Sequence, residues 1–104
     1  MADRIEQLRR LLESDPNDAF CLYALGMEYV TQNQPGTAAS HLELSLRSDE
    51  DQPYAHFHLA RCHASMGETA KAIDAINQGL ETAQRTGDTD AARELAELRE
   101  GLGA

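Results

Sequence analysis

Tryptophan is absent from this chain of 104 residues, and the other aromatic side chains make up only 5% of it. Strands favour aromatic and β-branched residues, whereas this chain is rich in Ala, Leu, Glu and Arg, which lose little side-chain entropy in a helix. The composition therefore predicts an all-α fold. The length suits one hydrophobic core, so we expect a single domain over residues 1–104.

Cysteine is scarce as well, with Cys21 and Cys62 as the only two. Small secreted domains that depend on disulfides usually carry several, so we expect both thiols to be reduced. No apolar run approaches the roughly 20 residues of a membrane span, and the first residues carry charges where a signal peptide is apolar. These absences predict a cytoplasmic protein with no membrane partner.

Basic residues are few, because nine Lys and Arg stand against 18 Asp and Glu and give a net charge of -9. Lys71 is the single lysine, and the arginines are spread along the chain instead of clustering. A polyphosphate or an anionic membrane surface would be repelled by this balance. We therefore expect no nucleic acid among the partners.

Glycine-rich phosphate-binding motifs are also missing. His58 and Cys62 share one helical face, with His63 and His41 as further candidate ligands, but zinc needs three or four converging ligands. A Cys–His nucleophile needs an oxyanion-binding turn and an orienting group, and neither is recognisable. We expect no enzyme, no metal and no cofactor, and an activity centred on Cys62 is the least favoured alternative.

What is present is an internal repeat with a period of 34 residues. The shift pairs Phe20 with Tyr54, Tyr23 with Phe57, Leu25 with Leu59, Ala38 with Ala72, Leu42 with Ile76 and Leu46 with Leu80. The small residues Gly26, Ala60, Ala38 and Ala72 recur where paired helices would approach closely.

These residues carry a resemblance to the tetratricopeptide repeat family. The family pattern is a large residue, Leu-Gly and an aromatic on a first helix, then a small and a bulky residue on a second helix. The first copy matches with Leu22, Leu25, Gly26 and Tyr29, followed by Ala38 and Leu42. The second copy departs from it, because His56 and His63 stand where the family favours aromatics. The resemblance implies a right-handed α-α solenoid of antiparallel helix hairpins.

The repeat and its breaks predict six helices, at 3–14, 19–32, 36–48, 53–66, 70–86 and 89–101. We interpret 3–16 as an N-terminal cap helix, 19–52 and 53–86 as two repeats, and 88–102 as a solvating helix. The apolar stripes of the two flanking helices are Ile5, Leu8, Leu11 and Leu12, and Ala91, Leu95, Leu98 and Leu102.

Turn and cap residues fall at the matching places. Asn33 and Gly67, one period apart, can take the left-handed conformation that ends a first helix. Asp18 and Asp51 are expected N-caps, and Pro53 suits a first helical turn.

A second apolar stripe on the first helix of each repeat is the candidate binding site. At 100° per residue it lies about 130° from the packing stripe of the same helix. In the resembled family this position lines the concave groove that binds peptides. We call it the aromatic strip and define it by its residues, Phe20, Tyr23, Met27, Val30, Tyr54, Phe57 and Arg61.

The strip predicts a protein or peptide partner and the role of an adaptor or scaffold. Two alternatives stay open, because the N-terminal helix or a second copy of the chain could cover the rings instead. The second would make the protein a homodimer or a homo-oligomeric scaffold. Some domains of the resembled family clamp a C-terminal carboxylate with Lys, Arg and Asn. This strip offers Tyr23, Met27, His58 and Arg61 instead, so we expect apolar or aromatic anchors in the partner.

Overall fold

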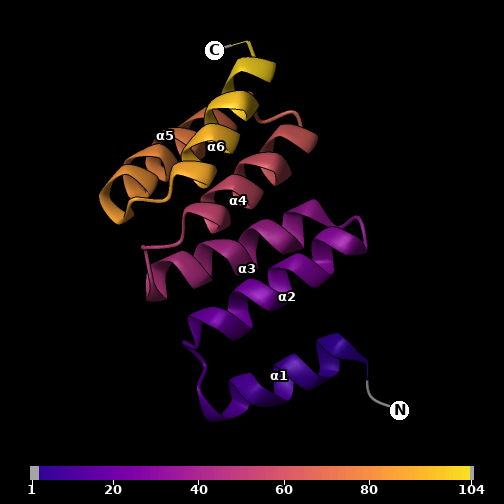
Figure 1. The fold of residues 1–104 in the computed structure, drawn as a ribbon. Coiled ribbons are helices and arrows are strands. Elements are labelled where there is room, and N and C mark those ends of the chain that lie inside the picture. Colours follow the sequence, from indigo (N-terminus) through magenta and orange to yellow (C-terminus); the bar gives the residue numbers. More distant parts are fainter. Residues whose placement is uncertain (1–2, 104) are drawn as a thin grey trace.

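The computed structural model describes residues 3–103 and consists there of six α-helices without strands (Figure 1). Their bounds are α1 Arg4–Ser14, α2 Ala19–Thr31, α3 Pro35–Ser48, α4 Pro53–Ser65, α5 Thr69–Thr86 and α6 Thr89–Gly101. The predicted all-α class is confirmed, and every helix begins and ends within one residue of its predicted bounds.

The helices stack in chain order, so that each packs on the one before it (Figure 1). In addition, α4 contacts α6. This arrangement gives an elongated shape of 43 × 28 × 19 Å. The tight pairs α2/α3 and α4/α5 are the predicted hairpins.

Both hairpins turn in the same way, one period apart. Asn33 and Gly67 adopt left-handed backbone conformations with φ of 57° and 76°. The chain then closes each turn with a backbone hydrogen bond of 2.9 Å, from Gln34 to Tyr29 and from Glu68 to His63. The predicted role of Asn33 and Gly67 is confirmed.

Of the two predicted N-caps, Asp18 is confirmed and Asp51 is wrong. Asp18 caps α2, since its side chain accepts a hydrogen bond from the backbone N–H of Cys21 at 3.0 Å. Asp51 does not cap α4, and its carboxylate pairs with Arg85 instead. The N-cap of α4 is Gln52, whose side-chain amide donates to the carbonyl oxygens of Ser45 and Asp49, and α4 begins with Pro53 as predicted.

The core lies between paired helices and follows the repeat pattern. Its fully buried members include Leu25, Ala38, Leu42, Ala60, Ala72 and Ile76. Gly26 shows why a small residue recurs, because a β-carbon there would lie 2.9 Å from two atoms of the Leu42 side chain. The helices α2 and α3 approach too closely for any larger residue.

The flanking helices match their predicted stripes with one exception. Leu8 on α1 and Ala91 and Leu95 on α6 are buried, whereas Leu11 is 57% exposed. The prediction for Leu11 was wrong because α1 packs only on α2, so that a single narrow side of it is covered.

Candidate functional site

The aromatic strip begins on α2, where its four residues differ in exposure. Phe20 lies in the first turn and is 71% exposed, and Val30 lies in the last turn and is 37% exposed. Tyr23 and Met27 between them are half-buried. The ends of the α2 segment are therefore open, and its middle is partly covered.

On α4 the strip forms a compact cluster of rings. Tyr54 and Phe57 meet edge to face, with ring centroids 6.2 Å apart. The guanidinium carbon of Arg61 lies 5.8 Å from the Phe57 centroid, within the range of a cation–π contact. Three strip residues thus support one another, and Arg61 has no ion pair among residues 3–103.

His58 joins the two halves of the strip. Its ring contacts Phe57 on α4, with centroids 5.2 Å apart, and Tyr23 on α2 at 6.2 Å. Burial lowers the pKa of His58, and the nearby Arg61 lowers it further. The imidazole is therefore neutral at neutral pH and fills the space between the helices as a ring.

The sequence analysis named His58 both as a possible ligand partner of Cys62 and among the side chains that the strip offers, but it left His58 out of the residues that define the strip. The signal was available, because His58 stands next to Phe57 and one helical turn before Arg61. A residue adjacent to a strip position points partly toward the neighbouring first helix. The contact of His58 on α4 with Tyr23 on α2, which the repeat pattern does not specify, decides the outcome.

Glu94 on α6 is a second residue that the sequence did not reveal. The Tyr54 hydroxyl donates a hydrogen bond to its carboxylate, which raises the pKa of Tyr54 to about 12. This bond fixes the direction of the Tyr54 ring. The helix α6 therefore borders the strip, in addition to covering the apolar face of α5.

Phe20, Met27 and Val30 make no ring contact with the α4 cluster. Val30 instead lines a small cavity of about 200 Å³, together with His58, Arg61 and Cys62. The strip is thus a cluster on α4 and Tyr23, a small hollow near Val30, and an isolated ring at Phe20.

The N-terminal helix leaves the Phe20 ring uncovered. It lies against the opposite stripe of α2, where Arg9 donates a hydrogen bond to the Tyr29 hydroxyl. Its Arg4 approaches Glu28 at 3.6 Å. Coverage of the strip by α1, one of the two alternatives, finds no support in these contacts.

The features around Cys62 are unsuited to catalysis. The side chain is 4% exposed, and burial raises the pKa of its thiol, which keeps it in the protonated, unreactive form. His63 faces Glu43 and Glu68, and His41 stacks on Tyr29. Within residues 3–103, no three side chains of the kinds that bind metals converge. Both cysteines are free.

Comparison with known proteins now places the chain in a family. The family model described as tetratricopeptide repeat matches residues 29–98. This chain belongs to the tetratricopeptide repeat family. It is 30% identical over 91 residues to the TPR repeat-containing protein PA0015 of Pseudomonas aeruginosa, covering 88% of this chain and 87% of that protein.

Two solved structures show how this tetratricopeptide chain compares in three dimensions. The protein BPP2914 of Bordetella parapertussis superposes with a TM-score of 0.86 at 27% identity, covering 99% of this chain and 90% of that one. PcrH, solved in complex with the chaperone binding region of PopD, gives a TM-score of 0.89 at 19% identity, covering 95% and 75%. The second likeness concerns the fold alone.

The tetratricopeptide fold suggests protein–protein interaction as the general role. Among the helices described for this chain, none has the length and apolar character needed to cross a membrane.

Proposed function

We propose that this tetratricopeptide protein is an adaptor that binds a segment of another protein along the aromatic strip. The observation that carries the proposal is the set of ring contacts from Tyr23 through His58 and Phe57 to Tyr54, next to the exposed ring of Phe20. Apolar rings that remain partly exposed on two neighbouring helices favour an interaction site.

The partner that suits this surface carries apolar or aromatic anchors. A cluster of rings favours such anchors, because aromatic pairs add about 0.5–1.5 kcal/mol each beyond the area that they bury. Arg61 could pair with one acidic group of the partner, since it lies over the Phe57 ring and makes no ion pair with the described residues. Arg61 is the only cationic side chain among the residues that define the strip. A clamp that binds two carboxylates of the partner, such as a C-terminal carboxylate and an acidic side chain, would need a second one.

The fold of PcrH, a structural neighbour, holds the chaperone binding region of PopD. This supports the proposal only in showing that the same helical frame can accommodate a segment of another protein. Members of the family generally act as adaptors without catalytic activity, which agrees with the buried, protonated thiol of Cys62.

Affinity capture from an extract of the source cell tests the proposal. The wild type is compared with the double variant Tyr23→Ser/Phe57→Ser, and Leu44→Ser serves as the control because Leu44 is an exposed apolar residue of α3 outside the strip. We expect the wild type and the control to retain the same proteins and the double variant to lose them. Capture of the same proteins by all three would show that the strip is not the site.

A homodimer through the strip is the second candidate. It is favoured by the Phe20 ring, which is largely exposed and which a second copy of the chain would cover. Light scattering of the wild type and of Phe57→Ser separates the two functions. A monomeric mass for both supports an open strip. A stable dimer that dissociates in the variant would replace the adaptor with a self-associating scaffold.

A further inference from the structure

A second open surface lies on the other side of α4. It is a groove of about 960 Å³ between α3 and α5, which we call the α3–α5 groove. Its floor consists of Leu46 from α3, Ala75 from α5, and His56, Leu59 and His63 from α4. At 100° per residue, these α4 residues lie about 150° from the strip residues Tyr54, Phe57 and Arg61. The groove and the strip are therefore separate surfaces.

The repeat explains why this groove is open. At the equivalent place in the first repeat, Tyr29 is buried, stacks on His41 with centroids 5.1 Å apart, and accepts a hydrogen bond from Arg9. One period later these three residues become His63, Ala75 and Glu43. An imidazole thus replaces the phenol of Tyr29, and a methyl group replaces the imidazole of His41. A carboxylate replaces the guanidinium of Arg9. The second repeat therefore lacks the stacked ring pair and the arginine contact that the first repeat has at this place.

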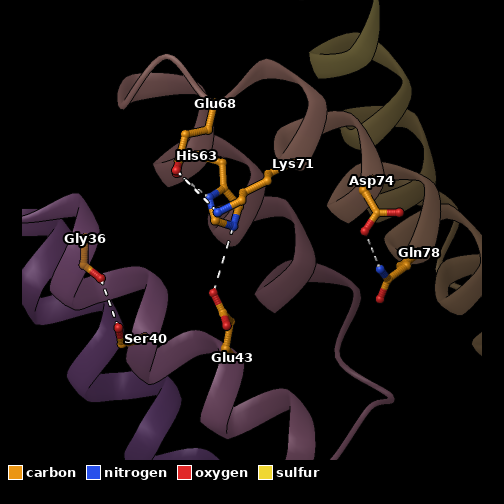
Figure 2. A network of polar contacts seen from close by, with 8 residues as sticks. All are labelled: Gly36, Ser40, Glu43, His63, Glu68, Lys71, Asp74 and Gln78. Atoms are coloured by element: carbon orange, nitrogen blue, oxygen red, sulfur yellow. Dashed lines mark hydrogen bonds and ion pairs between the residues drawn. The ribbon is translucent and has the colours of Figure 1, made fainter.

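The lining of the α3–α5 groove holds one more carboxylate than it holds cations. Its carboxylates are Glu43, Glu50, Asp74 and Glu81, and its cations are Arg47, Lys71 and Arg85. Figure 2 shows some of these side chains at close range, with Lys71 paired with Glu68 and Glu43 facing His63. Gln78 donates a hydrogen bond of 3.0 Å to the Asp74 carboxylate.

Two of these cations are already neutralised by acids that do not line the groove. Lys71 pairs with Glu68 at 3.4 Å, and Arg85 pairs with Asp51. Arg47 has no ion pair within residues 3–103. Among the lining cations, Arg47 is thus the one without an acidic partner among the described residues, and the lining holds four carboxylates.

The floor contains a polar atom whose partner is missing. His56 is 6% exposed, and its Nδ1 atom has no hydrogen-bond partner among the described residues. Burial lowers the pKa of His56, so the ring is neutral at neutral pH. A neutral imidazole has one nitrogen that accepts a hydrogen bond, and a buried polar group left without one costs free energy.

We propose that the α3–α5 groove is a second docking site, and that its occupant is a segment of another protein that carries arginine beside apolar residues. The arginine supplies the cation that Glu43 has replaced. Glu43 and Asp74, exposed on opposite walls, are its carboxylate partners. Apolar neighbours of the arginine contact Leu46, which is half-buried.

Nuclear magnetic resonance of the full, uniformly labelled chain tests this site. The probe is a short peptide of alternating arginine and leucine, acetylated and amidated at its ends, and the comparison peptide has glutamate in place of arginine. We expect the arginine peptide to shift the amide resonances of Leu59, Ala75 and Gln78, and the glutamate peptide to leave them in place. Unchanged groove resonances with both peptides would overturn the proposal.

Two variants with the same change of charge distinguish binding of the arginine peptide at the α3–α5 groove from its general attraction to an acidic protein. Glu43→Arg restores the base of the first repeat and is expected to weaken binding of the arginine peptide about tenfold or more, since like charges then face each other. Glu13→Arg, on an exposed position of α1, is expected to change it less than about twofold. Equal weakening by both variants would reduce the binding to nonspecific electrostatics and contradict the site.

A third variant keeps this inference distinct from the proposed function. Tyr23→Ser/Phe57→Ser removes the strip on the other face and is expected to leave the arginine peptide bound with unchanged affinity. Loss of binding in that double variant would place the peptide on the strip and overturn the α3–α5 site alone.

Discussion

At the scale of single residues, the second repeat differs most from the first through its histidines. His56 occupies the position of Leu22, and His63 that of Tyr29. The first repeat buries an apolar residue and a hydrogen-bonded phenol there, whereas the second holds one imidazole without a partner and one that donates to Glu68 at 2.9 Å. Positions 56 and 63 therefore affect both the stability of the second repeat and the lining of the α3–α5 groove.

Replacing His56 with leucine, the residue of the first repeat, should stabilise the protein. Removing a buried polar group that lacks a partner recovers about 1–3 kcal/mol of unfolding free energy. The pH dependence should also weaken. Burial lowers the pKa of His56 from its usual 6.5, so as pH falls below that value the unfolded chain takes up a proton that the folded chain does not, and stability is lost.

Urea unfolding of the wild type and of His56→Leu at pH 7.5 and pH 5.5 measures both effects. We expect the wild type to lose more stability between the two pH values than the variant does. Equal losses would show that His56 does not couple folding to protonation.

Gly79 on α5 provides a second prediction for a single residue. A β-carbon there would lie 2.8 Å from Cβ of His56 and 3.0 Å from a methyl group of Leu95. Overpacking costs about 1–3 kcal/mol, and the gain in helix propensity returns about 1. Gly79→Ala should therefore lower the melting temperature. The control Gly36→Ala, where the nearest atom is 3.8 Å away, should leave the melting temperature unchanged or raise it.

Single residues were the least predictable part of the molecule. The roles of His58, Glu94 and Gly79 depend on contacts between different helices, and a 34-residue repeat specifies only contacts that recur. Leu11 is exposed because the side of α1 on which it lies does not pack on α2, and the repeat does not specify which side of α1 is covered. The residues that follow the repeat, such as Gly26 and Ala38, were predicted because both copies impose the same packing.

At the scale of the helices, order and turns follow from short sequence signals. The left-handed residues Asn33, Gly67 and Gly87 end α2, α4 and α5, and the aspartates Asp3, Asp18 and Asp88 cap α1, α2 and α6. These signals are local in the chain, which is why all six helices could be predicted. The start of α4 differs, because Gln52 is held by Ser45 across the break and leaves Asp51 outside the cap.

Capping gives a matched pair of substitutions. Asp18→Ala removes the acceptor of the Cys21 N–H and should cost about 1 kcal/mol of unfolding free energy. Asp51→Ala removes only an exposed pair with Arg85 and should cost at most about 0.5 kcal/mol. Chemical denaturation of the two variants checks the difference. A larger cost for Asp51→Ala would mean that its side chain supports the start of α4 after all.

At the scale of the whole molecule, the stacked helices present two unlike surfaces. One carries the rings of the aromatic strip, and the other is the acidic α3–α5 groove with its two imidazoles. The 34-residue repeat was enough to predict membership of the tetratricopeptide family. It was also enough to predict that the strip residues lie on the first helix of each repeat. The groove could not, because it arises from the residues that break the repeat.

The central claim is that the aromatic strip binds a polypeptide, and a titration tests it most directly. A peptide selected from a random display library against the wild type is titrated into the wild type, Phe20→Ser and Leu44→Ser. Phe20 is largely exposed, so its loss should leave the fold intact. The account predicts that Phe20→Ser binds about tenfold more weakly or worse and that Leu44→Ser binds as the wild type does. Equal affinity for all three proteins would contradict it.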